Sequence, residues 1–96
     1  MNEVVLHYDN DIVAMVNRDV VEIQSIGMYA ANFCSTRLDD TDFIWAVSFE
    51  EIVDKHTTEL YDDFKLTTEC NLQFTDFSLL LQRIRVAYTV LTNPKY

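Results

Sequence analysis

The beginning of the chain carries two short hydrophobic segments separated by a polar turn. Residues Glu3–Tyr8 (EVVLHY) are rich in side chains that favour strands, and Ile12–Asn17 (IVAMVN) places alternate apolar residues on one face. Between them stands Asp9-Asn10-Asp11, and Asn and Asp side chains bond to their own backbone in tight turns. The pattern predicts a β-hairpin.

A helical spacing follows this hairpin. From Val20 to Cys34, apolar residues recur three and four positions apart, which is the spacing of one helix face. Asp19 and Glu22 have the form of a capping box, with Asp in the place of Ser or Thr. We therefore predict a helix over Val20–Cys34 and a polar loop over Ser35–Asp42.

The middle of the chain is ambiguous at one segment. Phe43–Phe49 (FIWAVSF) alternates as a strand does, but Thr41 and Asp42 could also cap a helix that runs straight through it. We favour the strand. Ser48–Glu51 (SFEE) is a second capping box, and the apolar spacing after it predicts a helix over Phe49–Phe64.

The last third of the chain predicts one more strand and one more helix. Leu66–Phe74 (LTTECNLQF) alternates between apolar and polar side chains, as in a strand with one solvated face. The last helix begins at a cap on Thr75 or Asp76 and stops before Pro94, since the residue before a proline disfavours the helical conformation. These elements indicate an α+β fold, a small single domain over residues 1–96 with antiparallel strands and about three helices.

The last helix is apolar on more than one side. Besides its main hydrophobic face it carries Leu79, Val86 and Val90 on the opposite side. Such a helix is either sandwiched within the core or contributes to a surface for self-association.

The charge of the chain is strongly negative. Its 96 residues include 16 Asp and Glu against 7 Lys and Arg, which gives a formal net charge of -9. The basic residues are scattered, so we expect no direct binding to nucleic acid or to an anionic membrane surface. No apolar run could span a bilayer, and Glu3 stands where a secretory signal carries positive charge, so we expect a cytoplasmic protein. Gly27 is the only glycine, which excludes a glycine-rich phosphate loop.

Two sets of residues could carry cysteine or zinc chemistry, and each has a simpler explanation. His7, Cys34, His56 and Cys70 could bind zinc, but no pair among them has the short spacing of zinc ligands. Cys34 or Cys70 could act as a nucleophile with His56 as its base, but no motif supplies a third group to orient them. Two buried thiols and two ordinary histidines explain the same residues in a reducing compartment, although the two cysteines would also permit one disulfide.

A calcium loop is the third candidate site. Counted from Asp40, Asp42 and Glu51 fall at positions 3 and 12 of an EF-hand loop. However, Ile44 and Trp45 fall at positions 5 and 6, where the loop requires an oxygen ligand and a glycine. A polar entry to the next element is the better explanation, and we expect no enzyme, no metal and no cofactor.

Acidic residues are concentrated in about a quarter of the chain. Between Asp39 and Asp63 lie nine of the 16 acids, and Lys55 is the only base in that span. A solvated face that keeps the protein soluble is the simple explanation, and a binding surface is the alternative. The nine predicted partner-binding residues are Asp39, Asp40, Asp42, Glu50, Glu51, Asp54, Glu59, Asp62 and Asp63.

Part of this arrangement opposes the stability of the predicted helix. Glu50 with Asp54, and Glu59 with Asp63, are like-charge pairs four residues apart, which are mildly destabilising. Asp62 and Asp63 lie in the predicted last turn, where the helix dipole disfavours negative charge by about 0.3–1 kcal/mol each. Charges placed against local stability favour a binding role.

The partner of such a surface would be basic. Carboxylates along a helix of about 20 Å can imitate the phosphates that a nuclease, a polymerase or a guide-RNA effector binds. The neighbouring aromatic residues Phe43, Trp45, Phe49 and Tyr61 could add apolar anchors, although core packing explains most of them.

In size and charge alone, the chain resembles two groups of small inhibitors. These are bacterial toxin immunity proteins and phage proteins that block restriction or CRISPR nucleases by mimicking nucleic acid; no motif carries the resemblance. We therefore expect a non-enzymatic inhibitor that binds a basic nucleic-acid-handling protein. The alternative is a self-associating structural or adaptor protein, a homodimer for example, that uses the apolar surplus of the last helix.

Overall fold

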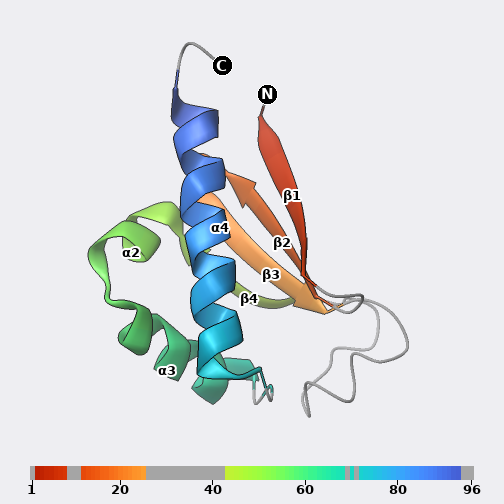
Figure 1. The fold of residues 1–96 in the computed structure, drawn as a ribbon, viewed down its shortest axis with the longest axis vertical. Coiled ribbons are helices and arrows are strands. Elements are labelled where there is room, and N and C mark those ends of the chain that lie inside the picture. The colour runs from red at the N-terminus through yellow and green to blue at the C-terminus, as the bar shows by residue number, and fades with distance from the viewer. Residues whose placement is uncertain (1, 9–11, 26–42, 69, 71, 94–96) are drawn as a thin grey trace.

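The computed structural model describes residues 2–8, 12–25, 43–68, 70 and 72–93 of the chain. Within these residues four strands precede three helices (Figure 1). The expected α+β fold of antiparallel strands with about three helices is confirmed. The elements are β1 (Glu3–Tyr8), β2 (Ile12–Asn17), β3 (Val20–Ser25), β4 (Phe43–Ser48), α2 (Phe49–Asp54), α3 (Thr57–Thr68) and α4 (Phe74–Thr92).

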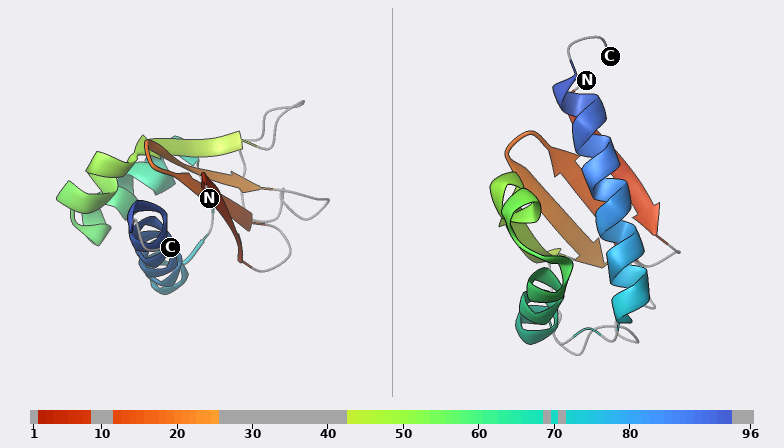
Figure 2. Two further views of the ribbon diagram at one scale, coloured as in Figure 1. Left: turned by 90° about the horizontal axis from the view of Figure 1, so that it is seen from above. Right: turned by 60° about the vertical axis from the view of Figure 1, so that its left-hand side comes forward.

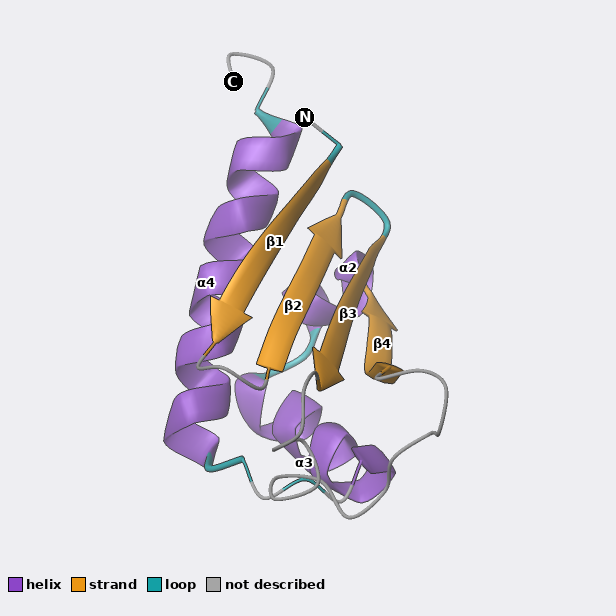
Figure 3. Cartoon of the chain, turned by 90° about the vertical axis from the view of Figure 1, so that its right-hand side faces the viewer, coloured by secondary structure: helices purple, strands orange, loops and turns teal. Residues whose placement is uncertain are grey.

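The four strands form one antiparallel sheet in the order β1-β2-β3-β4, so that β1 and β4 are its two edges (Figure 3). The predicted hairpin of the first two strands is confirmed, because Glu3 pairs with Asn17 and Tyr8 with Ile12. The three helices cover one face of this sheet, as Figure 2 shows. The core lies between the two layers, where Ile12 and Val16 of β2 are buried with the apolar residues of α4.

The helix predicted over Val20–Cys34 is wrong in its described part, since Val20–Ser25 is strand β3. Val21 and Ile23 are fully buried while the residues between and after them are half-exposed, which is the alternation of a strand. Pairing with β2 on one side and β4 on the other overrides the helical spacing. Three further predictions lie outside the described residues: the rest of that helix, the loop at 35–42 and the turn at 9–11.

The capping box predicted at Asp19 and Glu22 is also wrong, because this segment turns between two strands. The side-chain oxygen of Asn17 accepts hydrogen bonds from the backbone N–H groups of Asp19 and Val20, each 2.8 Å long. Bonds of this kind replace those of a regular turn and hold β2 and β3 together as a hairpin.

The predicted strand at Phe43–Phe49 and the second capping box are confirmed, with the strand one residue shorter. β4 ends at Ser48, whose hydroxyl accepts from the Glu51 N–H at 3.2 Å. The Glu51 carboxylate accepts in return from the Ser48 N–H at 3.4 Å. This reciprocal pair fixes the start of α2 directly after the strand.

The single helix predicted over Phe49–Phe64 is in fact two helices. Lys55 is extended, with φ −93° and ψ 149°, and a new helix starts at Thr57. Arg85 of α4 reaches the break and donates hydrogen bonds to the Ile52 carbonyl at 3.1 Å and to the Thr57 hydroxyl at 3.4 Å. In an unbroken helix the Ile52 carbonyl would bond within the helix. The contact with Arg85 therefore stabilises the broken form.

The strand predicted at Leu66–Phe74 is wrong as well, because α3 continues to Thr68 and α4 begins at the end of that range. Leu66 is 84% exposed whereas Thr68 is buried, so alternate residues do not share one face. The Thr68 hydroxyl donates to the Phe64 carbonyl at 2.7 Å and accepts from the Cys70 N–H at 3.2 Å. These bonds close the end of α3 where the pattern suggested a strand.

The last helix is confirmed, and it starts earlier than predicted. Its N-cap is Gln73 rather than Thr75 or Asp76, and it ends at Thr92, before Pro94 as expected. Although α4 is the longest helix, neither it nor any other helix in the described part of the chain is long and apolar enough to cross a membrane.

Candidate functional site

Six of the nine predicted partner-binding acids lie on α2 and α3, which pack beside β4 (Figure 1). The other three, Asp39, Asp40 and Asp42, lie outside the described residues. Five of the six side chains are exposed and the sixth is half-buried. We call these six residues the acidic surface: Glu50, Glu51, Asp54, Glu59, Asp62 and Asp63.

Lys55 stands between the two helices, and the charges of acids on both affect its pKa. Its Nζ donates a hydrogen bond to a carboxylate oxygen of Glu51 at 3.1 Å, four residues earlier in the chain. The hydrogen bond and the charge of Glu51 raise the pKa of Lys55 above its ordinary value of 10.5, and they outweigh the lowering effect of desolvation. The charges of Asp63 and Glu59 raise this pKa further. Lys55 therefore pairs with Glu51 of α2 and also feels the more distant charges of α3.

Two acids of α2 line a hollow to which Glu51 does not contribute. Glu50 and Asp54 line a hollow of about 360 Å³ together with Arg18 and Asp19 from the turn between β2 and β3. The Arg18 guanidinium donates a hydrogen bond of 3.1 Å to the Leu91 carbonyl. Asp19 therefore adjoins the acidic surface, although no spacing along the chain indicates it.

Asp63 connects the acidic surface to the core. Its carboxylate accepts a hydrogen bond of 2.8 Å from the indole N–H of Trp45. Trp45 is only 2% exposed, and its ring meets Phe64 and Phe77 edge-on at centroid distances of 5.5 and 5.8 Å. This bond fixes the position of α3 against β4.

The aromatic residues considered as anchors for a partner are mostly committed to the core. Trp45 and Phe49 are each 2% exposed, and Phe49 stacks on Tyr88 with ring centroids 3.3 Å apart. Tyr61 is half-buried, and its hydroxyl donates to a backbone carbonyl at 2.7 Å. The side chain of Phe43 is outside the described set. The acidic surface therefore offers a partner little aromatic area from these residues.

Helix α3 ends later than the sequence predicts. The helix continues for five residues beyond Asp63, so Asp62 and Asp63 lie in its interior and the predicted dipole penalty is wrong. The like-charge pairs remain, because Glu50 and Asp54 share α2, and Glu59 and Asp63 share α3. Repulsion within each pair still opposes local stability.

The residues considered for zinc or nucleophilic chemistry do not form a site in the described part of the chain. His7 and His56 are exposed, and among the described residues no three His, Cys, Asp or Glu side chains could together hold a metal ion. Cys70 is buried, as predicted, but it is disulfide-bonded, so the prediction of a free thiol is wrong. The distance between Cα atoms decides which cysteines pair, and spacing along the chain does not give it. Cys34 lies outside the described residues.

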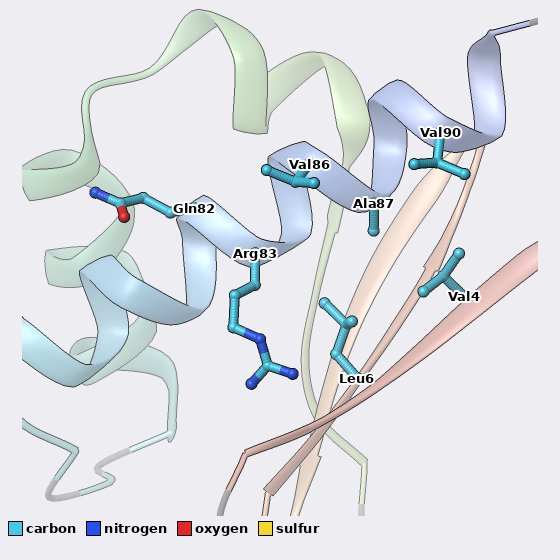
Figure 4. Close-up of a pocket in the computed structure, with 7 residues that line it drawn as sticks. All are labelled: Val4, Leu6, Gln82, Arg83, Val86, Ala87 and Val90. Carbon is cyan, nitrogen blue, oxygen red and sulfur yellow. The ribbon is translucent and has the colours of Figure 1, made fainter.

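An apolar groove between β1 and α4 is the second surface feature (Figure 4). It has a volume of about 570 Å³, and Val86 at its rim is 64% exposed. Leu79 and Val90 are 49% and 37% exposed, so these side chains are not sandwiched within the core. We call this groove the β1–α4 groove. Its lining residues are Val4, Leu6, Gln82, Arg83, Val86, Ala87 and Val90.

No protein-family model, curated protein or solved structure matches the chain. Its function is therefore argued from its own residues.

Proposed function

We propose that this chain is a non-enzymatic inhibitor that binds a basic, nucleic-acid-handling protein through the acidic surface. One observation carries the proposal: six carboxylates lie on two adjacent helices, whereas Lys65 in the last turn of α3 is the only Lys or Arg on them and Lys55 stands between them. The partner would be a nuclease, a polymerase or a guide-RNA effector whose groove normally holds phosphates.

The geometry of α3 supports mimicry of a phosphate backbone. Asp62 and Asp63 stand three and four residues after Glu59, so the three acids share one face of α3 within about one and a half turns. Glu50 and Asp54 extend the negative charge around the adjoining hollow. A groove lined with Lys and Arg could enclose such a ridge from more than one side.

Electrostatics would govern both the rate and the salt dependence of this binding. Opposite charges on the two proteins accelerate their encounter, and added salt screens that attraction. Since few aromatic side chains are exposed beside the acids, affinity would depend more on charge than it does in interfaces with aromatic anchors. We therefore expect complexes to dissociate at moderate ionic strength.

Capture from a lysate of the cell that encodes the chain tests the proposal. The immobilised full chain should retain a basic protein at low salt, and an excess of an oligonucleotide should release it, because both ligands would occupy one groove. The released protein should bind nucleic acid by itself, and adding the chain should inhibit that binding.

Two double variants with the same change in net charge locate the surface. Glu59→Lys with Asp62→Lys should abolish capture, since both acids are exposed and neither has a hydrogen bond to the core. Glu22→Lys with Asp76→Lys, on β3 and α4, should retain it. Equal capture by the two variants, or release by salt but not by the oligonucleotide, would contradict the proposal.

The alternative function, a self-associating structural or adaptor protein, would use different residues. Val86 and Val90 line the β1–α4 groove, whereas the acidic surface lies on the helices beside β4 at the other edge of the sheet. Self-association and inhibition are therefore compatible in one molecule.

A further inference from the structure

Among the described strands, β1 is an edge of the sheet, and it lies beside the β1–α4 groove (Figures 3 and 4). Edge strands expose backbone N–H and C=O groups, and proteins usually protect them with proline, lysine or a bulge. Residues Glu3–Tyr8 contain no proline and no lysine, and they pair with β2 without a shift in register. Among the described strands, only β2 pairs with β1, and Glu3–His7 carries none of these protective features.

One hydrogen bond indicates which backbone groups of β1 face outward. The guanidinium of Arg83, on α4, donates to the His7 carbonyl at 3.0 Å, so this carbonyl is directed away from β2. Alternate residues of an antiparallel strand direct their backbone groups to the same side. Those of Glu3 and Val5 therefore face the same free edge. A carbonyl oxygen has two lone pairs, so His7 can accept a second hydrogen bond there.

We propose that a second copy of this chain occupies this edge, with its β1 antiparallel to the first and a two-fold axis at Val5. In this register Val5 lies opposite Val5 of the second copy, and Glu3 lies opposite His7. The outward backbone groups of both strands then bond to each other, and the two sheets join into one. The inference is independent of the proposed inhibition, because it uses no residue of the acidic surface.

In this arrangement the side chains of the two β1 strands are complementary to each other. On the solvent face, Val5 is 47% exposed and would be covered by its own copy, flanked on each side by a Glu3–His7 pair. On the helix face, Val4 would lie opposite Leu6 of the second copy. Since both residues line the groove, the two grooves would meet and cover each other.

Helix α4 adds a matching stripe beside the strand. Leu79, Arg83, Val86 and Val90 follow one another at spacings of four, three and four residues, which is the repeat of a seam between packed helices. In Figure 4, Val86 and Val90 lie above the groove and Val4 and Leu6 below it. A two-fold axis would bring the stripe next to its own copy, as an isologous interface requires.

The distribution of charge permits this contact despite a net charge of -9 on each copy. The strand and the groove contribute one acid, Glu3, and one fixed cation, Arg83. The acidic surface packs beside β4, the opposite edge of the sheet. The two acidic surfaces would therefore lie at the outer ends of the dimer, where their mutual repulsion is weakest.

Sedimentation equilibrium over about 5–500 µM tests the proposal. The average mass should rise with concentration from that of one chain of 11.2 kDa to twice that value. Val5→Lys places two ammonium groups face to face and should weaken the dimer at least about tenfold, a loss that corresponds to about 1.4 kcal/mol. Val53→Lys is the matched control, since Val53 is an exposed valine of α2 and its substitution should leave the dimer intact.

A mixing experiment separates the interface from mere loss of stability. Val5→Lys and Val5→Glu should each be monomeric, but an equimolar mixture should form a heterodimer, because residue 5 of one copy faces residue 5 of the other. Mixing the corresponding Val53 variants should have no such effect. Raising the salt concentration should strengthen the wild-type dimer by screening its net charge, whereas it should weaken capture of a basic partner.

Several results would overturn the proposal. A wild-type protein that remains monomeric at 500 µM has no such interface. A dimer that survives Val5→Lys, or a mixture of Val5→Lys and Val5→Glu that stays monomeric, shows that residue 5 does not lie on the two-fold axis. None of these results bears on the capture experiment, so the failures of the two proposals are distinguishable.

Discussion

The indole N–H of Trp45 donates a hydrogen bond of 2.8 Å to the carboxylate of Asp63, so a buried ring of β4 holds an exposed acid of α3. The two residues are 18 positions apart in the chain. Asp63 belongs to the acidic surface, yet its position depends on the core. A change at this residue therefore affects stability as well as charge.

Asp63→Ala should lower the free energy of unfolding by about 1–3 kcal/mol, because it leaves the partly buried indole N–H without its acceptor. Asp63→Asn keeps an acceptor oxygen and should cost less. Asp62→Ala removes a neighbouring exposed acid and should stay within about 0.5 kcal/mol of the wild type. Urea unfolding followed by circular dichroism measures all three, and equal losses for Asp62→Ala and Asp63→Ala would contradict the assignment.

Arg85→Lys should destabilise the protein although it keeps the positive charge. The guanidinium bonds to the Ile52 carbonyl and the Thr57 hydroxyl at once, which a single ammonium group does not reproduce. The expected loss is about 1–3 kcal/mol in urea unfolding. Thr57→Val, which removes only the longer of the two bonds, should cost clearly less. An unchanged stability of Arg85→Lys would show that the helix break does not depend on this contact.

Thr68→Val tests the end of α3 with almost no change of shape. The substitution removes the hydroxyl that donates to the Phe64 carbonyl and accepts from the Cys70 N–H, in a side chain only 1% exposed. We expect a loss of about 1–3 kcal/mol by thermal or urea unfolding. Thr67→Val makes the same chemical change at an exposed position and should be nearly neutral. If both variants are neutral, the buried hydroxyl does not cap the helix.

Glu51→Gln should lower the pKa of Lys55 toward its ordinary value. Glu51 supplies the hydrogen bond that raises this pKa, and its charge has a larger effect than that of Asp63 or Glu59. Glutamine at this position can still complete the capping box with Ser48, so α2 should remain folded. Glu59→Gln should lower the pKa less, because Glu59 acts only through its charge and more weakly. Side-chain NMR titration of Lys55 measures both shifts, and equal shifts would contradict this ranking.

The sign of this shift also fixes its effect on stability. The pKa of Lys55 is higher in the folded protein than in the unfolded chain. The pairing of Lys55 with Glu51 therefore stabilises the fold fully at any pH below the pKa of the unfolded chain. This stabilisation is lost as the pH rises through the raised folded value, above 10.5. Stability at neutral pH should therefore be insensitive to the titration of Lys55, and Lys55→Gln should flatten the alkaline part of a stability profile.

Local patterns were sufficient for about half of the fold. The hairpin of β1 and β2, the strand β4, the capping box at Ser48 and the helix before Pro94 were all predicted, because short-range alternation and capping determine them. Val20–Ser25 was not, since its β-branched residues also fit a helical spacing and only the flanking strands β2 and β4 decide between the two.

The sequence likewise predicted only part of the acidic surface. Charge counting located six described acids on the segment that forms α2 and α3, but it could not show that the helix breaks at Lys55 and divides these acids between two helices. It also could not show that Asp19 lies beside Glu50. These relations depend on where the chain bends, and spacing along a helix predicts neighbours only while the helix is unbroken.

By itself, the sequence determined the α+β class, the negative charge and its concentration in one segment, because composition and short-range periodicity carry that information. Only the tertiary structure decided the break between α2 and α3, the buried role of Trp45 and the groove between β1 and α4. Each of these depends on contacts between residues far apart in the chain; His7 and Arg83, for example, are 76 positions apart. Such contacts form only when the helices pack on the sheet, and no local pattern specifies them.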